Sequence, residues 1–281
     1  WRTIFDWCEY LGADSLWFRG AVTETYQGSL TMEQPFKAYN LQAIPKLGAE
    51  AHRRGLKFGV WTAAYATYPK QSNRNKPQYL YAKDVSRSTG KVSDLEFVSL
   101  LDEHRIEHLA RFAADMQAMP EVDYIGFDYF RSDRGGYEMV ERFAAEMPVR
   151  LPSNWDSMNA NQRMLYFAKA IEGGGWQKNA DVYDCWNWWR AHLGASNLLK
   201  IRQKSGVTKP LWIFLLSWRH GVQHGQDPLM LTDAGVTVLA PMLYQVPGRA
   251  HFDTMVKEWN EYLNADQVNL AVGDQVDFYW H

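Results

Sequence analysis

Apolar residues recur along this chain in two alternating patterns. Stretches in which they return every three or four positions, as at Leu41, Ile44 and Leu47, predict amphipathic helices. Short runs of consecutive apolar residues predict buried strands. Helices are expected at 2–12, 40–54, 102–118, 136–146, 160–171 and 185–204. Strands are expected at Asp14–Arg19, Leu56–Thr62, Val122–Phe130, Pro210–Trp218, Val236–Tyr244 and Val268–Asp274, with Phe97–Leu100 and Val149–Leu151 as weaker candidates.

The regular alternation of helices and strands predicts an α/β fold with a parallel sheet. A doubly wound sheet and a (β/α)8 TIM-type barrel both have this alternation. The barrel is favoured, because no Gly-rich phosphate-binding turn follows a strand and the loops after the strands are long. The loop of about thirty residues after Thr62 is expected to be functional. The chain opens on a helix and closes just after a strand, so we expect one barrel domain over residues 1–281, part of a longer chain, with its first or last strand outside this sequence.

Composition and charge narrow the classes of partner. Hydrophobic residues make up 46% of the 281 residues, enough for a large core. The net charge of −2 and the lack of a Lys/Arg-rich run argue against nucleic acid as a partner. No apolar run reaches the roughly 18–20 residues of a membrane-spanning helix. The 13 Trp and 15 Tyr residues indicate either an aromatic core or a sugar-binding cleft, and their positions must decide between the two.

Cysteine and histidine spacing gives no sign of a metal site. Cys8 and Cys185 lie far apart and lack the spacing of metal ligands, and the sequence leaves open whether they pair. His220 and His224 have i, i+4 spacing, but the residues around them do not read as a helix, so zinc is not expected. We therefore expect neither a metal nor a cofactor.

Charged and aromatic residues gather at the predicted strand ends, where barrel enzymes place their chemistry. In the strand Val122–Phe130, Tyr124, Gly126 and Asp128 share one face because side chains alternate along a strand. Asp128 should point into the barrel mouth, with Gly126 beneath it leaving room for a neighbour. Arg131 is close enough in sequence to pair with this carboxylate, so a simple rim ion pair is the alternative to a functional role. The candidate residues at the strand ends are Arg19, Glu24, Tyr26, Trp61, Asp128, Tyr129, Arg131, Asp133, Trp218, Arg219, His220, Tyr244 and Asp274.

Four segments together resemble the glycosyl-hydrolase-like (β/α)8 barrels, distant relatives of the α-amylase superfamily. The stretch Leu16–Ser29 looks like that family's second strand, and A-H-R-R-G-L-K-F-G-V-W-T at Ala51–Thr62 is similar to its third. V-D-Y-I-G-F-D-Y-F-R at Val122–Arg131 resembles its fourth strand. Trp189–Arg190, Pro210–Gly221 and A-P-M-L-Y at Ala240–Tyr244 resemble its later strands. On this alignment the family's first strand would lie before Trp1 and its last after His281.

The resemblance implies glycoside hydrolysis, with Asp128 as the catalytic carboxylate of the fourth strand. Cleavage of a glycosidic bond usually takes two carboxyl groups, one on each side of the anomeric centre. Asp128 would be the nucleophile or the base, and Asp274 is the first candidate for the second group, ahead of Glu24 and Asp133. The wider superfamily has a Glu at the end of its fifth strand, whereas this strand ends in S-W-R-H-G, so the identity of the general acid is open. His220 could transfer a proton near neutral pH or simply bind substrate.

The remaining candidates are assigned to substrate binding. Arg19, Arg131 and Arg219 would orient hydroxyls or carboxylates, and three arginines in one mouth would suit an acidic sugar. Stacking platforms are expected at Trp61, Tyr129, Trp218 and Tyr244. In W-N-W-W-R, by contrast, Trp186, Trp189 and Leu193 form one helical stripe that we expect to be core.

Three functions compete at this point. The first is a glycoside hydrolase acting on a polysaccharide or glycan outside the cytoplasm, in an extracellular or periplasmic setting. The second is a catalytically silent barrel that binds carbohydrate, which the missing fifth-strand Glu favours. The third is a barrel lyase or isomerase that uses His220.

Overall fold

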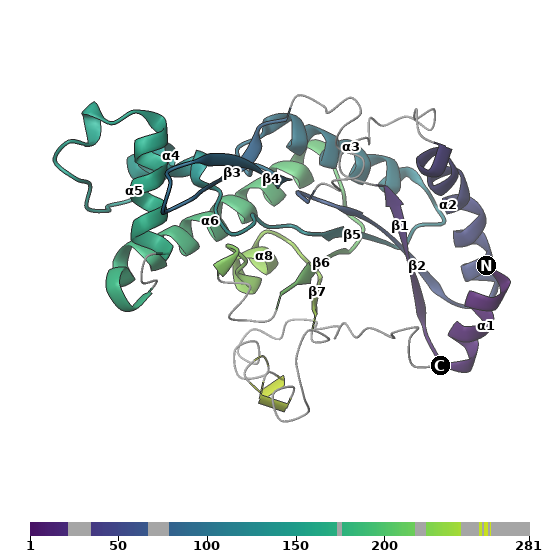
Figure 1. Cartoon of the computed structure of the whole chain (residues 1–281). Helices are drawn as coiled ribbons and strands as arrows, with labels where there is room; N and C mark the ends of the chain where they lie inside the picture. The colour runs from purple at the N-terminus through teal and green to yellow at the C-terminus, as the bar shows by residue number, and fades with distance from the viewer. Residues whose placement is uncertain are drawn as a thin grey trace.

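The computed structural model describes residues 1–21, 35–66, 79–172, 176–216 and 223–242, together with positions 253, 254, 256, 257 and 259 (Figure 1). Its helices are α1 (Arg2–Tyr10), α2 (Pro35–Arg53), α3 (Glu103–Ala118), α4 (Val140–Glu146), α5 (Ala160–Glu172), α6 (Trp176–Ser205, with a kink at Asn179) and α8 (Pro228–Asp233). Short 3-10 helices are η1 (Tyr137–Met139) and η2 (Trp155–Ser157). The strands are β1 (Ser15–Ala21), β2 (Lys57–Ala63), β3 (Tyr81–Val85), β4 (Val92–Val98), β5 (Tyr124–Asp128), β6 (Leu211–Leu215) and β7 (Val238–Pro241).

Five strands form one parallel sheet in the order β1-β2-β5-β6-β7. They correspond to five of the six strands expected from the sequence, and the sixth, Val268–Asp274, lies outside the described residues. Each strand of this sheet pairs with the next one along the chain, once the β3–β4 pair is set aside. A doubly wound sheet reverses its strand order at a switch point, and no reversal occurs in the described sheet. A (β/α) barrel is also wound without a reversal.

Helices α2 and α3 cover one face of the parallel sheet. Side chains that point from the sheet toward these helices are buried. Phe58, Val60, Ile125, Phe127 and Ile213 are completely inaccessible to solvent. A side chain at Gly20 of β1 would touch Val60, Ile44 of α2 and Phe112 of α3, so both helices pack on this same face. Helix α6 packs in turn along α3. One covered face and a singly wound order are barrel features, although the described strands do not close into a barrel.

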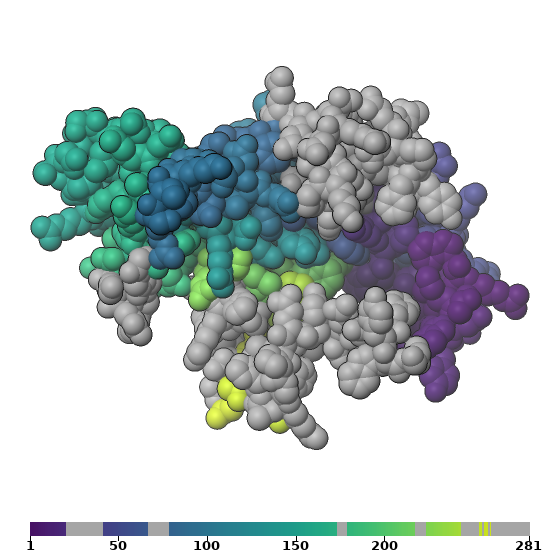
Figure 2. Space-filling view, viewed as in Figure 1, coloured from purple at the N-terminus to yellow at the C-terminus, as the bar shows by residue number. Residues whose placement is uncertain are grey.

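The long segment after β2 corrects one expectation. It was predicted to be a loop, with Phe97–Leu100 as a weak strand of the main sheet. Instead β3 and β4 form a separate antiparallel hairpin, and Gly90 adopts a positive φ in its turn. The hairpin lies with α4 and α5 at one end of the molecule, away from α1 and α2 at the other (Figures 1 and 2). Val149–Leu151 forms no strand, and α8 was not expected.

The aromatic stripe expected in the W-N-W-W-R segment is confirmed. Trp186, Trp189 and Leu193 are buried as the core stripe of α6. Cys8 and Cys185 are not bonded to each other. None of the helices in the described part of the chain is long and apolar enough to cross a membrane.

Candidate active site

The face of the sheet opposite α2 and α3 carries aromatic and charged side chains. Strand alternation places Trp17 and Arg19 of β1 on this face, opposite the face that holds Phe18. Residues that pair directly on neighbouring strands point to the same side of the sheet. Arg19 pairs with Trp61, Trp61 with Gly126, and Gly126 with Trp212, so these residues share one face. Asp128 lies one step further toward the carboxyl ends, beside Ala63. The residues of this face, called here the inner face, are Trp17, Arg19, Gly59, Trp61, Tyr124, Gly126, Asp128, Trp212 and Phe214.

Two tryptophan rings from separate strands meet on the inner face. Trp17 of β1 and Trp212 of β6 are separated by two strands, so in a flat sheet their Cα atoms would lie about 14 Å apart at about 4.8 Å per strand. Their ring centroids are only 4.3 Å apart. The Trp17 ring lies over Gly59 of β2 and the Trp212 ring lies over Gly126 of β5, so the two indoles lean toward each other across the strands between them.

Two glycines make this close approach possible. A Cβ at Gly59 would lie less than 3.0 Å from the Trp17 ring, and one at Gly126 would lie less than 3.0 Å from the Trp212 ring. Neither distance is sterically allowed, so the two indoles occupy the space of the missing side chains. The expected room above Gly126 is thus present, and Trp212 fills it.

Asp128 ends β5 at the rim of the inner face. Its Oδ1 accepts a hydrogen bond of 2.7 Å from the backbone N–H of Tyr129. Burial raises the pKa of the Asp128 carboxyl, while that hydrogen bond and the positive charges of Arg131 and Arg19 act in the opposite direction. A perturbed carboxyl group at the carboxyl end of a parallel strand is typical of catalytic sites.

The residue after Asp128 has a strained backbone. Tyr129 has φ +51°, and it is the one non-glycine residue with positive φ among those described. Its carbonyl accepts a 2.9 Å hydrogen bond from Arg131 N–H, and the Arg131 guanidinium lies 5.0 Å from the centre of its ring. The same guanidinium lies 5.5 Å from the ring of Phe97 in β4. Strain of this kind clusters at functional sites, and here it turns the chain sharply behind the Asp128 carboxylate.

Trp61 lies beside Arg19 on the inner face. The Arg19 guanidinium carbon is 5.6 Å from the Trp61 ring centre, and Phe214 meets the ring edge-on at 6.0 Å. Trp61 keeps part of its surface exposed, so a sugar ring could stack there.

Asp133 lies in the loop that follows β5, next to a histidine that sequence analysis did not select for the site. Asp133 Oδ1 is 3.7 Å from Nδ1 of His224, and Arg131 Nη1 is 3.4 Å from the same nitrogen. Burial, followed by the charges of Arg131 and Arg190, lowers the pKa of His224 to about 3. His224 is therefore a neutral imidazole at physiological pH, which can exchange hydrogen bonds but does not carry a charge.

Arg190 of α6 supports this loop through hydrogen bonds, a role that was not predicted from the sequence. The side chain is 2% exposed, and it donates hydrogen bonds to Ser132 Oγ at 2.9 Å, to the Asp133 carbonyl at 3.1 Å and to the Gln223 carbonyl at 2.7 Å. It thus connects the segment after β5 to the segment before α8. The spacing of the W-N-W-W-R motif predicts only the buried stripe, because the partners of Arg190 are distant in sequence.

Six of the residues expected at the site are described, and the structure brings Arg19, Trp61 and Asp128 to the inner face. Tyr129, Arg131 and Asp133 follow in the loop behind Asp128. The remaining seven expected residues lie outside the described part of the chain: Glu24, Tyr26, Trp218, Arg219, His220, Tyr244 and Asp274. Within the described residues, no group of three His, Cys, Asp or Glu side chains could hold a metal ion.

Comparison with known proteins returns glycoside hydrolases among similar structures. No family model and no curated protein matches this sequence. The PgaB (BpsB) glycoside hydrolase domain from Bordetella bronchiseptica aligns with TM-score 0.49 and 11% identity, over 81% of this chain and 65% of that one. An α-galactosidase from Lactobacillus brevis aligns with TM-score 0.33 and 15% identity, over 95% and 38% of the two chains. A GH36 α-galactosidase from Geobacillus stearothermophilus, in complex with raffinose, aligns with TM-score 0.24 and 13% identity, over 79% and 33%. This chain therefore spans less than two thirds of each of these structures.

Proposed function

We propose that this chain is a glycoside hydrolase that binds a glycan along the inner face and cleaves it with the Asp128 carboxylate. The observation that carries the proposal is the position of Asp128, a partly buried carboxyl group with a raised pKa at the carboxyl end of β5, beside an aromatic surface. The similarity of Ala51–Thr62 and Val122–Arg131 to the glycosyl-hydrolase-like barrels, distant relatives of the α-amylase superfamily, supports it from the sequence. A substrate outside the cytoplasm, in an extracellular or periplasmic setting, fits this activity.

The geometry of Asp128 suits a nucleophile or a base. The Tyr129 N–H donates to Oδ1, and the other oxygen has no protein hydrogen-bond partner among the described residues. That oxygen is the one we assign to attack at the anomeric carbon or to activation of a water molecule. Arg19 and Arg131 favour the ionised form that either role needs.

The second carboxyl group of the reaction is assigned to a residue other than Asp133. The Asp133 carboxylate accepts a hydrogen bond from Arg134 N–H at 2.8 Å and faces His224, so it is engaged in its own loop. Asp274 remains the first candidate, followed by Glu24. Separations of about 5–5.5 Å from Asp128 would give retention, and about 6.5–9.5 Å would give inversion.

The test is cleavage of a panel of neutral and acidic glycans by the parent, by Asp128→Asn and by Asp94→Asn. Asp94 is an exposed β4 carboxylate that pairs with Lys83, so its variant is a control for the loss of one surface charge. We expect Asp128→Asn to lose about three or more orders of magnitude in kcat, because acid-base or nucleophilic groups contribute on this scale, and Asp94→Asn to match the parent. Equal cleavage by the parent and Asp128→Asn would refute the assignment. Binding without cleavage by the parent would favour the silent carbohydrate-binding barrel.

A further inference from the structure

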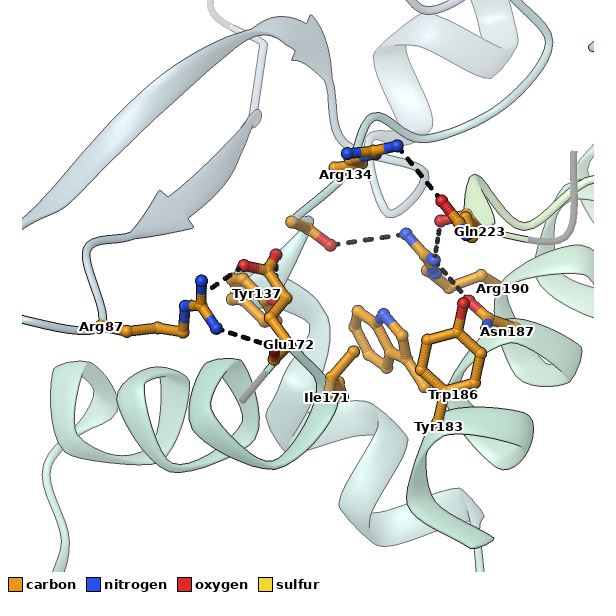
Figure 3. A pocket seen from close by; sticks show the side chains of 11 residues that line it. Arg87, Arg134, Tyr137, Ile171, Glu172, Tyr183, Trp186, Asn187, Arg190 and Gln223 are labelled. Atoms are coloured by element: carbon orange, nitrogen blue, oxygen red, sulfur yellow. Dashed lines mark hydrogen bonds and ion pairs between the residues drawn. The ribbon is translucent and has the colours of Figure 1, made fainter. Parts of the chain in front are cut away.

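A pocket of about 360 Å³ opens on the surface beside the loop that follows β5, between η1 and the helices α5 and α6 (Figure 3). Its wall includes Arg87, Arg134, Glu172, Tyr183 and Arg190. None of these residues belongs to the inner face, and none is assigned a contact with the substrate of the proposed hydrolysis. The volume lies within the range of pockets that bind small molecules.

The charge of this pocket is predominantly positive. Three arginines line it, and Glu172 is the carboxylate among its lining residues. Glu172 is already engaged, since its Oε1 accepts a 2.8 Å hydrogen bond from the Tyr137 hydroxyl and its Oε2 lies 3.6 Å from Arg87 Nε. The positive charges of Arg134 and Arg190 are therefore not matched by a carboxylate of the pocket wall.

Arg190 is a buried charge without a carboxylate partner. All of its hydrogen bonds end on neutral oxygens, and no described carboxylate lies within ion-pair distance. Its Nε is buried and has no hydrogen-bond partner in the described residues. The Trp186 ring, 5.0 Å from its guanidinium carbon, supplies partial compensation through its π face. The hydrogen bonds satisfy the two Nη atoms but leave the positive charge unneutralised, and an anion nearby would neutralise it.

Asn187 contributes a second unused donor on the same wall. Its Oδ1 accepts a 2.8 Å hydrogen bond from Arg190 Nη2, which fixes the orientation of the amide. Its Nδ2 is buried and lacks a hydrogen-bond partner in the part of the chain that the structure describes. Buried donors without acceptors are rare, and one next to a buried charge favours an electron-rich occupant.

We propose that this pocket binds a small ligand bearing a carboxylate or phosphate group. Arg134 and Arg87 contact the anionic group, since both side chains reach solvent and a guanidinium fork matches either oxyanion. The positive charge of the buried Arg190 guanidinium attracts the ligand, and the low dielectric of the protein interior strengthens this attraction. Because Arg190 also holds the carbonyls of Asp133 and Gly135, the occupant braces the loop that follows β5.

Calorimetric titration of the whole chain with glucuronate, inorganic phosphate and glucose tests the proposal. We expect at least one of the two anions to bind and glucose not to bind. Arg134→Gln should weaken anion binding about 10- to 100-fold, the scale of one hydrogen bond to a charged group, and Arg87→Gln should act in the same direction. Arg142→Gln is the matched control, because Arg142 pairs with Glu146 on α4 and does not line the pocket.

Each result of these titrations either identifies the anionic group of the ligand or overturns the proposed anion site. A preference for glucuronate over phosphate identifies a carboxylate ligand, and the reverse preference identifies a phosphorylated one. The proposal is overturned if neither anion binds at about 10 mM, a Kd weaker than most specific sites show. It is also overturned if glucose binds equally well, or if Arg134→Gln and Arg142→Gln bind alike. Asp128→Asn should bind the anion with the same affinity as the parent. The anion site is therefore tested independently of the proposed hydrolysis.

Discussion

The packing of the Trp212 indole over Gly126 on the inner face leads to a quantitative prediction for Gly126→Ala. The new methyl group would lie less than 3.0 Å from the Trp212 indole. The indole cannot move aside freely, because it is 3% exposed and meets Trp17 at 4.3 Å and Phe214 at 4.4 Å between ring centroids. Gly126 has no positive φ, so backbone strain does not add to this clash. Overpacking of this kind costs about 1–3 kcal/mol in the free energy of unfolding.

Thermal and urea unfolding of the two proteins measure this cost. At about 2 °C per kcal/mol for a chain of this size, the Tm of Gly126→Ala should fall by about 2–6 °C. Near-ultraviolet circular dichroism should change as well, because Trp212 and Trp17 lose their present geometry. Gly194→Ala in α6 is the matched control, since its Cβ meets nothing within 4 Å. There alanine should stabilise by about 0.5–1 kcal/mol through helix propensity. Equal stability and an unchanged aromatic spectrum for Gly126→Ala would refute the packing of Trp212 over the glycine.

Three further predictions concern the site and its support. Trp61→Ala should weaken glycan binding about 2- to 12-fold in a titration, the scale of an aromatic contact, while an unchanged affinity would remove Trp61 as a platform. Arg190→Met should lower the free energy of unfolding by about 3 kcal/mol or more, because several buried acceptors lose their donor. Urea unfolding measures this loss, and Arg190→Lys should lose less. Because the pKa of Asp128 is raised in the folded state, the protonated carboxyl favours the fold at low pH. Ionisation of the carboxyl at higher pH lowers the free energy of unfolding. Asp128→Asn should therefore gain stability relative to the parent as pH rises from about 4 through the folded pKa, and a relative gain on acidification would contradict this sign.

The strands of the sheet could be predicted because each is a short apolar run with alternating faces. That alternation also placed Asp128 and Gly126 on one side of β5, and the empty space over Gly126 followed from its missing side chain. The β3–β4 hairpin was missed because its outer strand is polar, with Ser93, Asp94 and Glu96 exposed, so it lacks the apolar run of a buried strand.

The support of the site could not be read from the sequence. Arg190 contacts Ser132 and Asp133 from 57–58 positions away, and His224 meets Arg131 from 93 positions away. Such contacts arise only when the sheet winds and α6 packs against it. The spacing around Arg190 reports its own helix, in which the aromatic stripe dominates the pattern.

A crystal structure of Asp128→Asn with a bound oligosaccharide would test the central claim most directly. The account predicts a sugar ring stacked on Trp61, with its anomeric carbon about 3–3.5 Å from the side chain at position 128, the distance of a reacting pair. A glycan bound elsewhere on the chain, with its anomeric carbon more than about 10 Å from that side chain, would contradict the assignment of the inner face as the active site.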